Sequence, residues 1–334
     1  MPEPHEAGSY LKATLESQPS ELARLLADDS AARVATRLRG CPRIFLVGTG
    51  TSFHGALAGQ FMLRSAGVEA WAVRAFEFVN YPPRLREDDG LILLSHRGSK
   101  RFSREGLGRF AENSRRWVAI TGEDSPLEGE GVVRTVAQEK SPVHTASHTA
   151  AMLRIAQVAA ALGRPAWASR LAHIPDIVRL AVERGDRVAS EVGNHEFRPV
   201  THFVGGGPAR ATAYEGALKL REASHQVSAE GHDVEGLLHG PLVSIQPKSV
   251  VVVVSQAGPS QKRMEEVEAA IREVGATVMS FASPEDVDEV LAPMVNVVPL
   301  QWLAYHVSRK LGVDADSFRR DEARYAAAQS KFTL

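Results

Sequence analysis

The stretch RIFLVGTGTS, residues 43–52, joins a short apolar run to a turn rich in glycine and hydroxyl residues. The apolar run of residues 43–47 is typical of a buried strand, and residues 52–65 have the period of a helix. Glycines let backbone N–H groups approach a ligand closely, and the N-terminus of a helix attracts an anion. We therefore expect Gly50, Thr51 and Ser52 to bind a phosphate group.

Two other interpretations of this turn stay open. A dinucleotide-binding loop would carry a third glycine at position 53, where the chain has Phe53. It would also carry an acidic residue after the next strand, which instead ends at Arg74. A tight turn with a purely structural role needs only the glycines.

Strand and helix patterns alternate along the rest of the chain, which predicts parallel sheets with helices on both faces. In the first half we expect strands over residues 43–47, 69–73, 91–94, 116–120 and 132–136, and helices over 20–38, 52–65, 103–113 and 144–162. In the second half we expect strands over 202–204, 249–254, 277–281 and 296–298, and helices over 209–223, 260–274 and 300–311. The fold class is therefore α/β with two tandem domains.

We place the domain boundary near residue 185, so that the domains cover residues 1–185 and 186–334. The segment 163–193 has apolar residues at helical spacing and is expected to be a helical connector. Residues 319–334 are rich in alanine and charge, which fits either a final helix or a mobile tail.

The composition argues against nucleic-acid and membrane partners. The 334 residues contain 39 Lys and Arg against 40 Asp and Glu, so there is no basic surface of the kind that binds nucleic acid. The single cysteine, Cys41, fits a reducing compartment, and the polar start does not resemble a secretory signal. We expect a cytoplasmic protein without a cofactor. His144 and His148 have the spacing of a metal pair, but no third ligand is evident nearby, so no metal site is predicted.

A second turn rich in polar residues, SHRGSK, follows the third predicted strand at residues 95–100. Ligands of open α/β sheets bind at the carboxyl ends of the strands. We expect Ser95, Arg97, Ser99 and Lys100 to complete the phosphate site. A solvated basic turn is the alternative.

The third informative region contains GGG at 205–207, EGALKLRE at 215–222 and EGLLHGP at 235–241. Glu215, Lys219 and Glu222 follow one another at helical spacing and line one stripe. Together with His239 they offer a base, a cation and an acid. A salt-bridged stripe on the protein surface is the structural alternative.

These stretches together resemble the sugar isomerase (SIS) domain family, in particular the tandem-SIS isomerase part of glucosamine-6-phosphate synthase. The similarity rests on residues 50–52, on 205–222, on the HGP triplet at 239–241 and on LAYHVSRKLGVDAD at 303–316. It implies two flavodoxin-like SIS domains, each a parallel sheet with helices on both faces.

The resemblance also implies residue roles. It assigns Glu222 to proton transfer between C1 and C2 of a sugar phosphate, Lys219 to the enediolate oxygen and His239 of a neighbouring subunit to ring opening. Lys331 corresponds to a lysine that forms an imine with the ketose. Other contacts to the substrate are implied for four residues: Thr49, His96, His144 and Thr145.

The sequence departs from the family pattern in four places, two of which are an extra residue around the HGP triplet and the C-terminal KFTL at 331–334, where the family has a lysine three residues before its threonine. The second turn has His96, Arg97 and Lys100 where the family has an amide and hydroxyls, and the segment from Glu139 lacks the family's Ala-Ser-Thr-Lys string. The phosphate is then expected to be held more by charge, or the substrate to carry another acidic group.

We expect an aldose–ketose isomerase, or a deaminase or deglycase, acting on a hexose or amino-hexose phosphate. It would work as a homodimer with a shared active site and without the glutaminase half of its relatives. A non-catalytic regulatory protein that binds a sugar phosphate is the alternative. A third possibility is an NADP-dependent reductase using Arg74.

Overall fold

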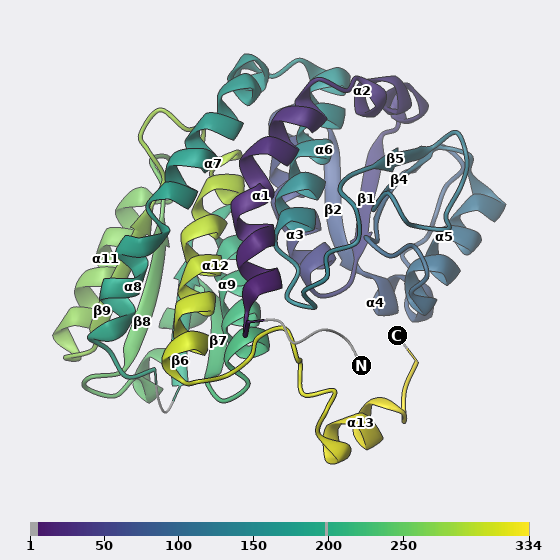
Figure 1. Cartoon of the computed structure of the whole chain (residues 1–334). Coiled ribbons are helices and arrows are strands. Elements are labelled where there is room, and N and C mark those ends of the chain that lie inside the picture. The colour runs from purple at the N-terminus through teal and green to yellow at the C-terminus, as the bar shows by residue number, and fades with distance from the viewer. Residues whose placement is uncertain (1–5, 198–199, 334) are drawn as a thin grey trace. The chain divides into compact units, whose positions relative to one another are not determined.

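The computed structural model describes residues 6–197 and 200–333, which form two compact units (Figure 1). The five-stranded unit contains Gln18–Glu139, Ala146–Pro175 and the segment from Ala326 onward. The four-stranded unit contains the segment up to Ser17, Lys140–Thr145 and Asp176–Tyr325. The chain therefore passes between the units earlier than the boundary predicted near residue 185, and its first segment groups with the second sheet.

The five-stranded unit is built on one parallel sheet with the strand order β2-β1-β3-β4-β5. Its strands are β1 (Arg43–Gly48), β2 (Glu69–Arg74), β3 (Gly90–Leu94), β4 (Trp117–Thr121) and β5 (Val132–Arg134). β1, β3 and β4 are nearly continuous buried apolar runs, as expected of parallel strands covered on both faces. The order is that of a flavodoxin-like fold.

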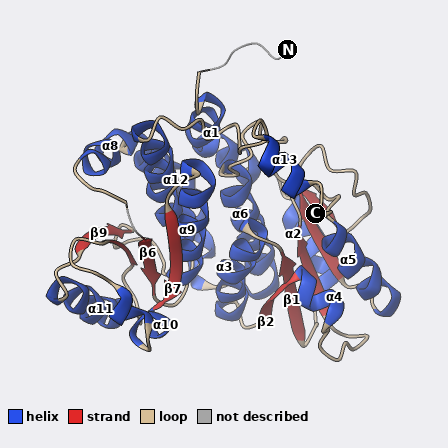
Figure 2. Cartoon of the chain, turned by 90° about the horizontal axis from the view of Figure 1, so that it is seen from below, coloured by secondary structure: helices blue, strands red, loops and turns tan. Residues whose placement is uncertain are grey.

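Helices cover both faces of this sheet (Figure 2). On one face, Gly59 of α3 (Thr51–Ser65) lies against Leu46 of β1 and Ile155 of α6 (Ala146–Gly163). On the other face, α4 (Ala75–Asn80) and α5 (Arg101–Asn113) form a core with alternate residues of the strands. The members of this core include Phe45, Val47, Phe78, Leu91, Leu93 and Phe110.

Other helices of the chain's first half are α1 (Ser9–Leu26), α2 (Ser30–Ala35) and the short 3₁₀ helix η1 (Thr36–Leu38). The single helix predicted over residues 20–38 is therefore wrong. α1 begins earlier, and the Asp28 side chain accepts hydrogen bonds from the backbone and hydroxyl of Ser30, which starts a new helix. Such local bonds to Asp compete with a continuous helix.

The four-stranded unit has the strand order β7-β6-β8-β9, again all parallel. Its strands are β6 (Val200–Gly205), β7 (Ser228–Asp233), β8 (Val250–Ser255) and β9 (Thr277–Ala282). α9 (Ala209–Ser224) and α12 (Ala292–Lys310) pack together on one face, and α8 (Gly185–Gly193) contacts α12. α10 (Val234–Leu238), η3 (Pro241–Ser244) and α11 (Gln261–Glu273) lie at the other face.

Two differences from the sequence prediction concern this unit. β7 was not predicted, because its sequence SAEGHD is polar, and a polar strand is stable here only as the edge of a sheet. The strand predicted over residues 296–298 is wrong, since these residues lie inside α12. A short buried apolar run does not distinguish a strand from a buried helix.

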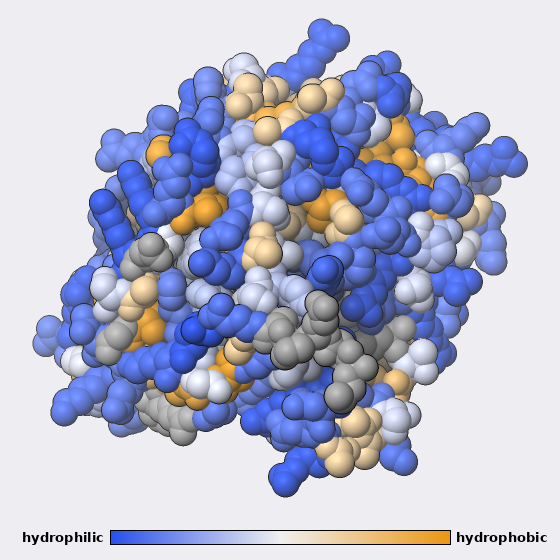
Figure 3. Space-filling view, in the orientation of Figure 1, coloured by the Kyte–Doolittle hydropathy of each residue, from blue (hydrophilic) through white to orange (hydrophobic). Residues whose placement is uncertain are grey.

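The predicted helical connector is confirmed as η2 (Ala166–His173), α7 (Ile174–Glu183) and α8. The C-terminal segment contains α13 (Ala323–Gln329), which buries none of its residues. None of the helices in residues 6–197 and 200–333 is long and apolar enough to span a membrane. The face shown in Figure 3 is mostly hydrophilic, with scattered hydrophobic side chains.

Candidate active site

The turn after β1 forms a tight entry into α3. A Cβ atom on Gly48 would lie 2.6 Å from the backbone carbonyl carbon of Ser52, so no larger residue fits there. Gly50 has a positive φ of 55°, which favours glycine, and its carbonyl accepts the backbone N–H groups of Phe53 and His54. Thr49 is exposed, whereas Gly50, Thr51 and Ser52 are half-buried. The turn therefore presents two hydroxyl residues and the start of a helix to solvent.

The turn after β3 has a similar construction. The backbone N–H of Gly98 donates to the Ser95 carbonyl at 3.0 Å, and Gly98 has a φ of 64°. Ser95 is buried, Arg97 and Ser99 are exposed, and Lys100 is half-buried immediately before α5. This arrangement leaves a cation and a hydroxyl accessible at the surface of the turn.

Both turns lie at the same edge of the five-stranded sheet. β1 and β3 are neighbours in parallel register, with Val47 beside Leu93, so their carboxyl ends meet. Neighbouring strands are about 4.8 Å apart. The pair also marks the point where the strand order reverses, which is where open α/β sheets bind ligands. The turns that follow β1 and β3 are therefore neighbours along this side of the sheet.

The stripe on α9 is buried. The Lys219 ammonium lies 3.3 Å from a carboxylate oxygen of Glu215 and 2.5 Å from one of Glu222. The side chains of Glu215 and Lys219 are 0% and 1% exposed, while that of Glu222 is 20% exposed. The alternative of a salt-bridged surface stripe is therefore wrong. Only Glu222 offers its carboxylate to solvent.

Electrostatics keep the Lys219 side chain charged. Burial alone lowers the pKa of Lys219, but the negative charges of Glu215 and Glu222 outweigh burial and raise the pKa above its usual value. A lysine held in this state is a permanent cation.

His239 lies far from this stripe within the same unit. Its side chain is 75% exposed at the end of α10, where Nδ1 contacts the Glu235 carbonyl oxygen at 2.9 Å. Glu222 is in the last turn of α9, before β7, whereas His239 comes after β7. A strand of six residues is about 20 Å long. Glu222 therefore lies near the amino ends of the strands, and His239 lies near their carboxyl ends.

The remaining predicted residues occupy varied positions. His96 is half-buried, and its ring packs against Gly122, where an added Cβ would lie 2.7 Å from the imidazole. His144 is half-buried, and Thr145 is buried with its hydroxyl donating to the Thr14 hydroxyl at 3.0 Å. Lys331 is exposed just after α13. The Thr145 hydroxyl is therefore engaged in the fold.

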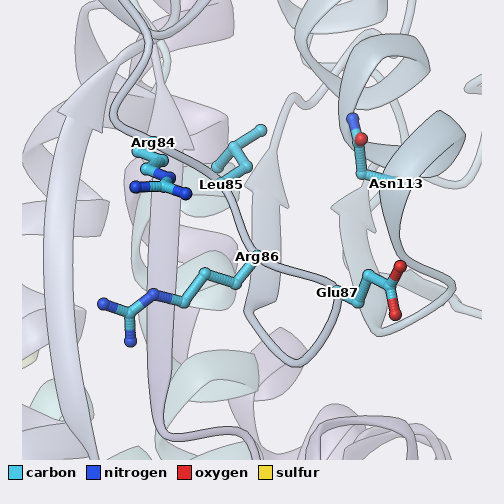
Figure 4. Close-up of a pocket in the computed structure, with 5 residues that line it drawn as sticks. All are labelled: Arg84, Leu85, Arg86, Glu87 and Asn113. Atoms are coloured by element: carbon cyan, nitrogen blue, oxygen red, sulfur yellow. The ribbon is translucent and has the colours of Figure 1, made fainter.

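A cavity of about 560 Å³ lies elsewhere on the five-stranded unit (Figure 4). Arg84, Leu85, Arg86 and Glu87 line it from the loop that enters β3, and Asn113 lines it from the end of α5. These segments belong to the amino edge of the sheet. The cavity is consequently separate from the turns that follow β1 and β3.

Two residues support the site: Glu215, which the sequence placed on the stripe without assigning it a separate role, and Gly48, which was not predicted to take part. Glu215 is the fully buried carboxylate that holds Lys219 from one side, and its position one helical turn before the lysine was the available signal. Gly48 keeps the β1 turn tight. A glycine directly after a buried strand and before a helix is the sequence signal for such a close approach.

Comparison with known proteins gives consistent matches. Residues 37–162 match the family described as SIS domain. The glutamine–fructose-6-phosphate aminotransferase (isomerizing) of Methanothermobacter thermautotrophicus is 30% identical over 337 residues, which cover 93% of this chain and 57% of the relative. The corresponding protein of Pyrobaculum aerophilum is 27% identical, with coverage of 93% and 56%. The chain thus spans about half the length of these curated relatives.

Solved structures share the fold. The C-terminal domain of glucosamine-fructose-6-phosphate aminotransferase from Francisella tularensis superposes with a TM-score of 0.80 at 20% identity, over 92% of this chain and 98% of that one. Tagatose-6-phosphate ketose/aldose isomerase from Escherichia coli gives 0.78 at 19% identity, over 92% and 95%. The two-sheet fold expected from the sequence is confirmed. Residues 37–162 of this chain are therefore similar to the SIS domain family, and both of its sheets share the fold of these solved structures.

Proposed function

We propose that the protein is an aldose–ketose isomerase of a hexose phosphate or amino-hexose phosphate. The observation that carries the proposal is the buried group of Glu215, Lys219 and Glu222, in which one carboxylate remains accessible beside a fixed cation. Relatives that match most of this chain are named isomerizing aminotransferases of fructose 6-phosphate, which supports the substrate class. The accessible turns after β1 and β3 supply an anion site for the phosphate.

The proposed chemistry moves one proton between neighbouring carbons. Starting from the ketose, Glu222 takes a proton from C1, the electron pair forms a C1–C2 double bond, and the C2 carbonyl becomes an enediolate oxygen. Glu222 then returns the proton to C2, while the proton of the O1 hydroxyl passes to O2, so that C1 becomes the aldehyde carbon and C2 carries the hydroxyl. Negative charge leaves Glu222 as it appears on the substrate, so Lys219 keeps the same number of negative neighbours throughout. A fixed cation of this kind contributes on the order of 3 kcal/mol to the transition state.

His239 and Lys331 have supporting roles in the proposal. His239 exchanges protons with the ring oxygen and the anomeric hydroxyl to open the sugar, for which histidine is suited near neutral pH. Lys331 forms an imine with the C2 carbonyl of the ketose as it binds, releasing water, and hydrolysis of this imine restores the carbonyl before the proton transfer. With an amino-sugar phosphate, the reverse proton transfer, from C2 to C1, leaves an imine at C2, and water hydrolyses this imine to the ketose with release of ammonia, which is the deaminase form of the activity.

Proton exchange tests the central step directly. Fructose 6-phosphate, glucosamine 6-phosphate and fructosamine 6-phosphate are incubated with the protein in D₂O, and loss of the C1 and C2 proton signals is followed by NMR. Glu222→Gln should slow exchange at least about a hundredfold, because it removes the base. Glu273→Gln, on the exposed side of α11, is the matched control and should leave the rate unchanged.

Binding of a sugar phosphate without any exchange would contradict the enzyme proposal and favour a regulatory ligand-binding protein. Equal rates for Glu222→Gln and Glu273→Gln would remove Glu222 from the mechanism. The substrate that exchanges fastest identifies whether an amino group is part of the natural ligand.

We further propose that the protein works as a cytoplasmic homodimer in which His239 of one subunit serves the site of the other. The support is that Glu222 and His239 lie at opposite edges of one sheet. Glu222→Gln and His239→Ala are each expected to be inactive. Their mixture, after subunit exchange, should regain about a quarter of wild-type activity, because half of the dimers contain one intact site. A mixture that stays inactive would contradict the shared site.

A further inference from the structure

A cluster of three possible metal ligands lies on the four-stranded sheet, apart from the residues discussed so far. His202 is on β6, and Glu230 and His232 are on the neighbouring strand β7. The register pairs His202 with Glu230 and Val204 with His232, so all three side chains point to the same face of the sheet. Their nitrogen and oxygen atoms lie within 4.8 Å of one another.

The distances within the cluster match those around one small metal ion. His202 Nδ1 and His232 Nε2 are 3.1 Å apart, and His232 Nε2 is 3.7 Å from a Glu230 carboxylate oxygen. Two imidazole nitrogens bound to a tetrahedral Zn²⁺ are about 3.3 Å apart, given Zn–N bonds of about 2.05 Å. A small rotation of the exposed Glu230 side chain suffices to bring its oxygen into the same sphere.

Burial is graded across the cluster. His202 is buried, the His232 side chain is 10% exposed and that of Glu230 is 58% exposed. The two imidazoles are therefore held in place by the fold, while the carboxylate side is open to an arriving ion.

We propose that His202, Glu230 and His232 form a Zn²⁺ site, with water as the fourth ligand. Two histidines and one glutamate are an established ligand set for zinc. The ion would join the polar edge strand β7 to β6. The proposal is independent of the proposed isomerase activity, because it uses none of the residues assigned to substrate.

Metal titration of the chelator-treated full chain tests the proposal. ZnCl₂ binding by calorimetry should show one site per chain, and Co²⁺ should give the visible spectrum of a four-coordinate ion. Glu230→Gln should weaken Zn²⁺ at least about tenfold, since even residues that only support a metal ligand cost that much. His232→Ala should abolish the site. His173→Ala, an exposed histidine of η2, is the matched control and should bind Zn²⁺ like the wild type.

The test requires no substitution of the buried His202. Glu230 is exposed, so Glu230→Gln should fold normally, and circular dichroism checks this for each variant. Zn²⁺ should raise the melting temperature of the wild type and of His173→Ala more than that of Glu230→Gln. The proposal is overturned if the wild type binds no Zn²⁺, or if Glu230→Gln and His232→Ala bind it as tightly as the wild type.

Discussion

In both units the first strand ends in a glycine-rich turn, Gly48 to Gly50 after β1 and Gly205 to Gly207 after β6. A Cβ atom on Gly48 or Gly205 would lie 2.6 Å or 2.4 Å from the backbone of the following helix. Gly50 and Gly207 have nearly the same positive φ, 55° and 54°. The two units therefore use the same backbone solution at the same point of the fold.

The contents of the two turn regions differ. In the four-stranded unit, the Glu289 carboxylate accepts hydrogen bonds from the Ser260 hydroxyl at 2.9 Å and from the Gln256 amide at 3.4 Å. The same carboxylate lies against Gly258, where a Cβ would be 2.7 Å from it. In the five-stranded unit, the corresponding turn after β3 presents the exposed cation Arg97 instead.

This difference indicates that the glycine-rich turn and the turn beside it, which we call the cradle of each unit, serve different purposes in the two units. A carboxylate of the protein satisfies the donors of the four-stranded unit, as an anionic ligand would. The turns of the five-stranded unit keep Thr49, Arg97 and Ser99 exposed and are basic. We infer that, among residues 6–197 and 200–333, the turns after β1 and β3 are better suited to bind a phosphate from solution than those after β6 and β8.

The largest expected effect comes from removing the exposed donors of the five-stranded unit. Arg97→Ala combined with Ser99→Ala should weaken fructose 6-phosphate binding by about a hundredfold, because a hydrogen bond to a charged group contributes about 1.5–3 kcal/mol. Ser260→Ala, the hydroxyl at the turn of the four-stranded unit, should change binding less than about twofold. Calorimetry measures both. Equal losses in the two variants would mean that the comparison assigns the phosphate to the wrong unit.

An intermediate effect is expected when the Glu289 carboxylate is removed from the turn region of the four-stranded unit. Glu289→Ala should lower the free energy of unfolding by about 2 kcal/mol, since buried donors lose their acceptor. Inorganic phosphate should then stabilise this variant more than it stabilises the wild type, because the Ser260 hydroxyl and the Gln256 amide become available to donate to an anion. Glu285→Ala, an exposed neighbour, is the control. Thermal melts with and without phosphate decide the point, and an unchanged response to phosphate would show that the carboxylate does not imitate a ligand.

The smallest expected effect is on the stability of the five-stranded unit at acidic pH. The four-stranded unit should not show this effect. In the five-stranded unit, Arg154 of α6 contacts Asp28. Burial raises the pKa of the Asp28 carboxyl, but the hydrogen bonds from Ser30 and the charge of Arg154 outweigh burial and lower the pKa to about 2. A lowered pKa contributes stability above pH about 4 that is lost as the pH falls toward 2.

Asp28→Asn should therefore flatten the acid dependence of the five-stranded unit, by less than about 1 kcal/mol because the aspartate is partly exposed. Asp286→Asn, on the surface of the four-stranded unit, is the matched control. Hydrogen exchange with mass spectrometry between pH 2.5 and 6 follows each unit separately. Identical pH profiles for Asp28→Asn and the wild type would contradict the prediction.

Much of the fold could be predicted because its strands are buried on both faces. β1, β3, β4 and β8 are apolar runs whose burial leaves little choice of structure. The edge strand β7 could not be predicted because its residues are polar and lack the apolar pattern of a strand. It is stabilised by pairing with β6, which is a tertiary contact. The strand predicted over the apolar residues 296–298 was wrong because a helix buried in the core is as apolar as a buried strand.

The candidate site was likewise predictable from the sequence only in part. The helical period alone places Glu215, Lys219 and Glu222 on one stripe, but it does not say whether that stripe is buried. Burial turns the lysine into a held cation and leaves one accessible carboxylate. The pairing of His202 with His232 also escaped prediction, because it depends on the register of two strands that are distant in sequence.

Sequence alone determined the alternating α/β pattern, the glycines of the turns and the spacing of charges along α9, because these follow from short-range sterics and from the period of the backbone. Tertiary structure decided that Glu289 fills one cradle, that Glu222 and His239 occupy opposite edges of a sheet, and that two histidines meet across strands. Such contacts depend on how sheets align and which faces lose water. Both are properties of the whole packed unit, so no local stretch of the chain contains them.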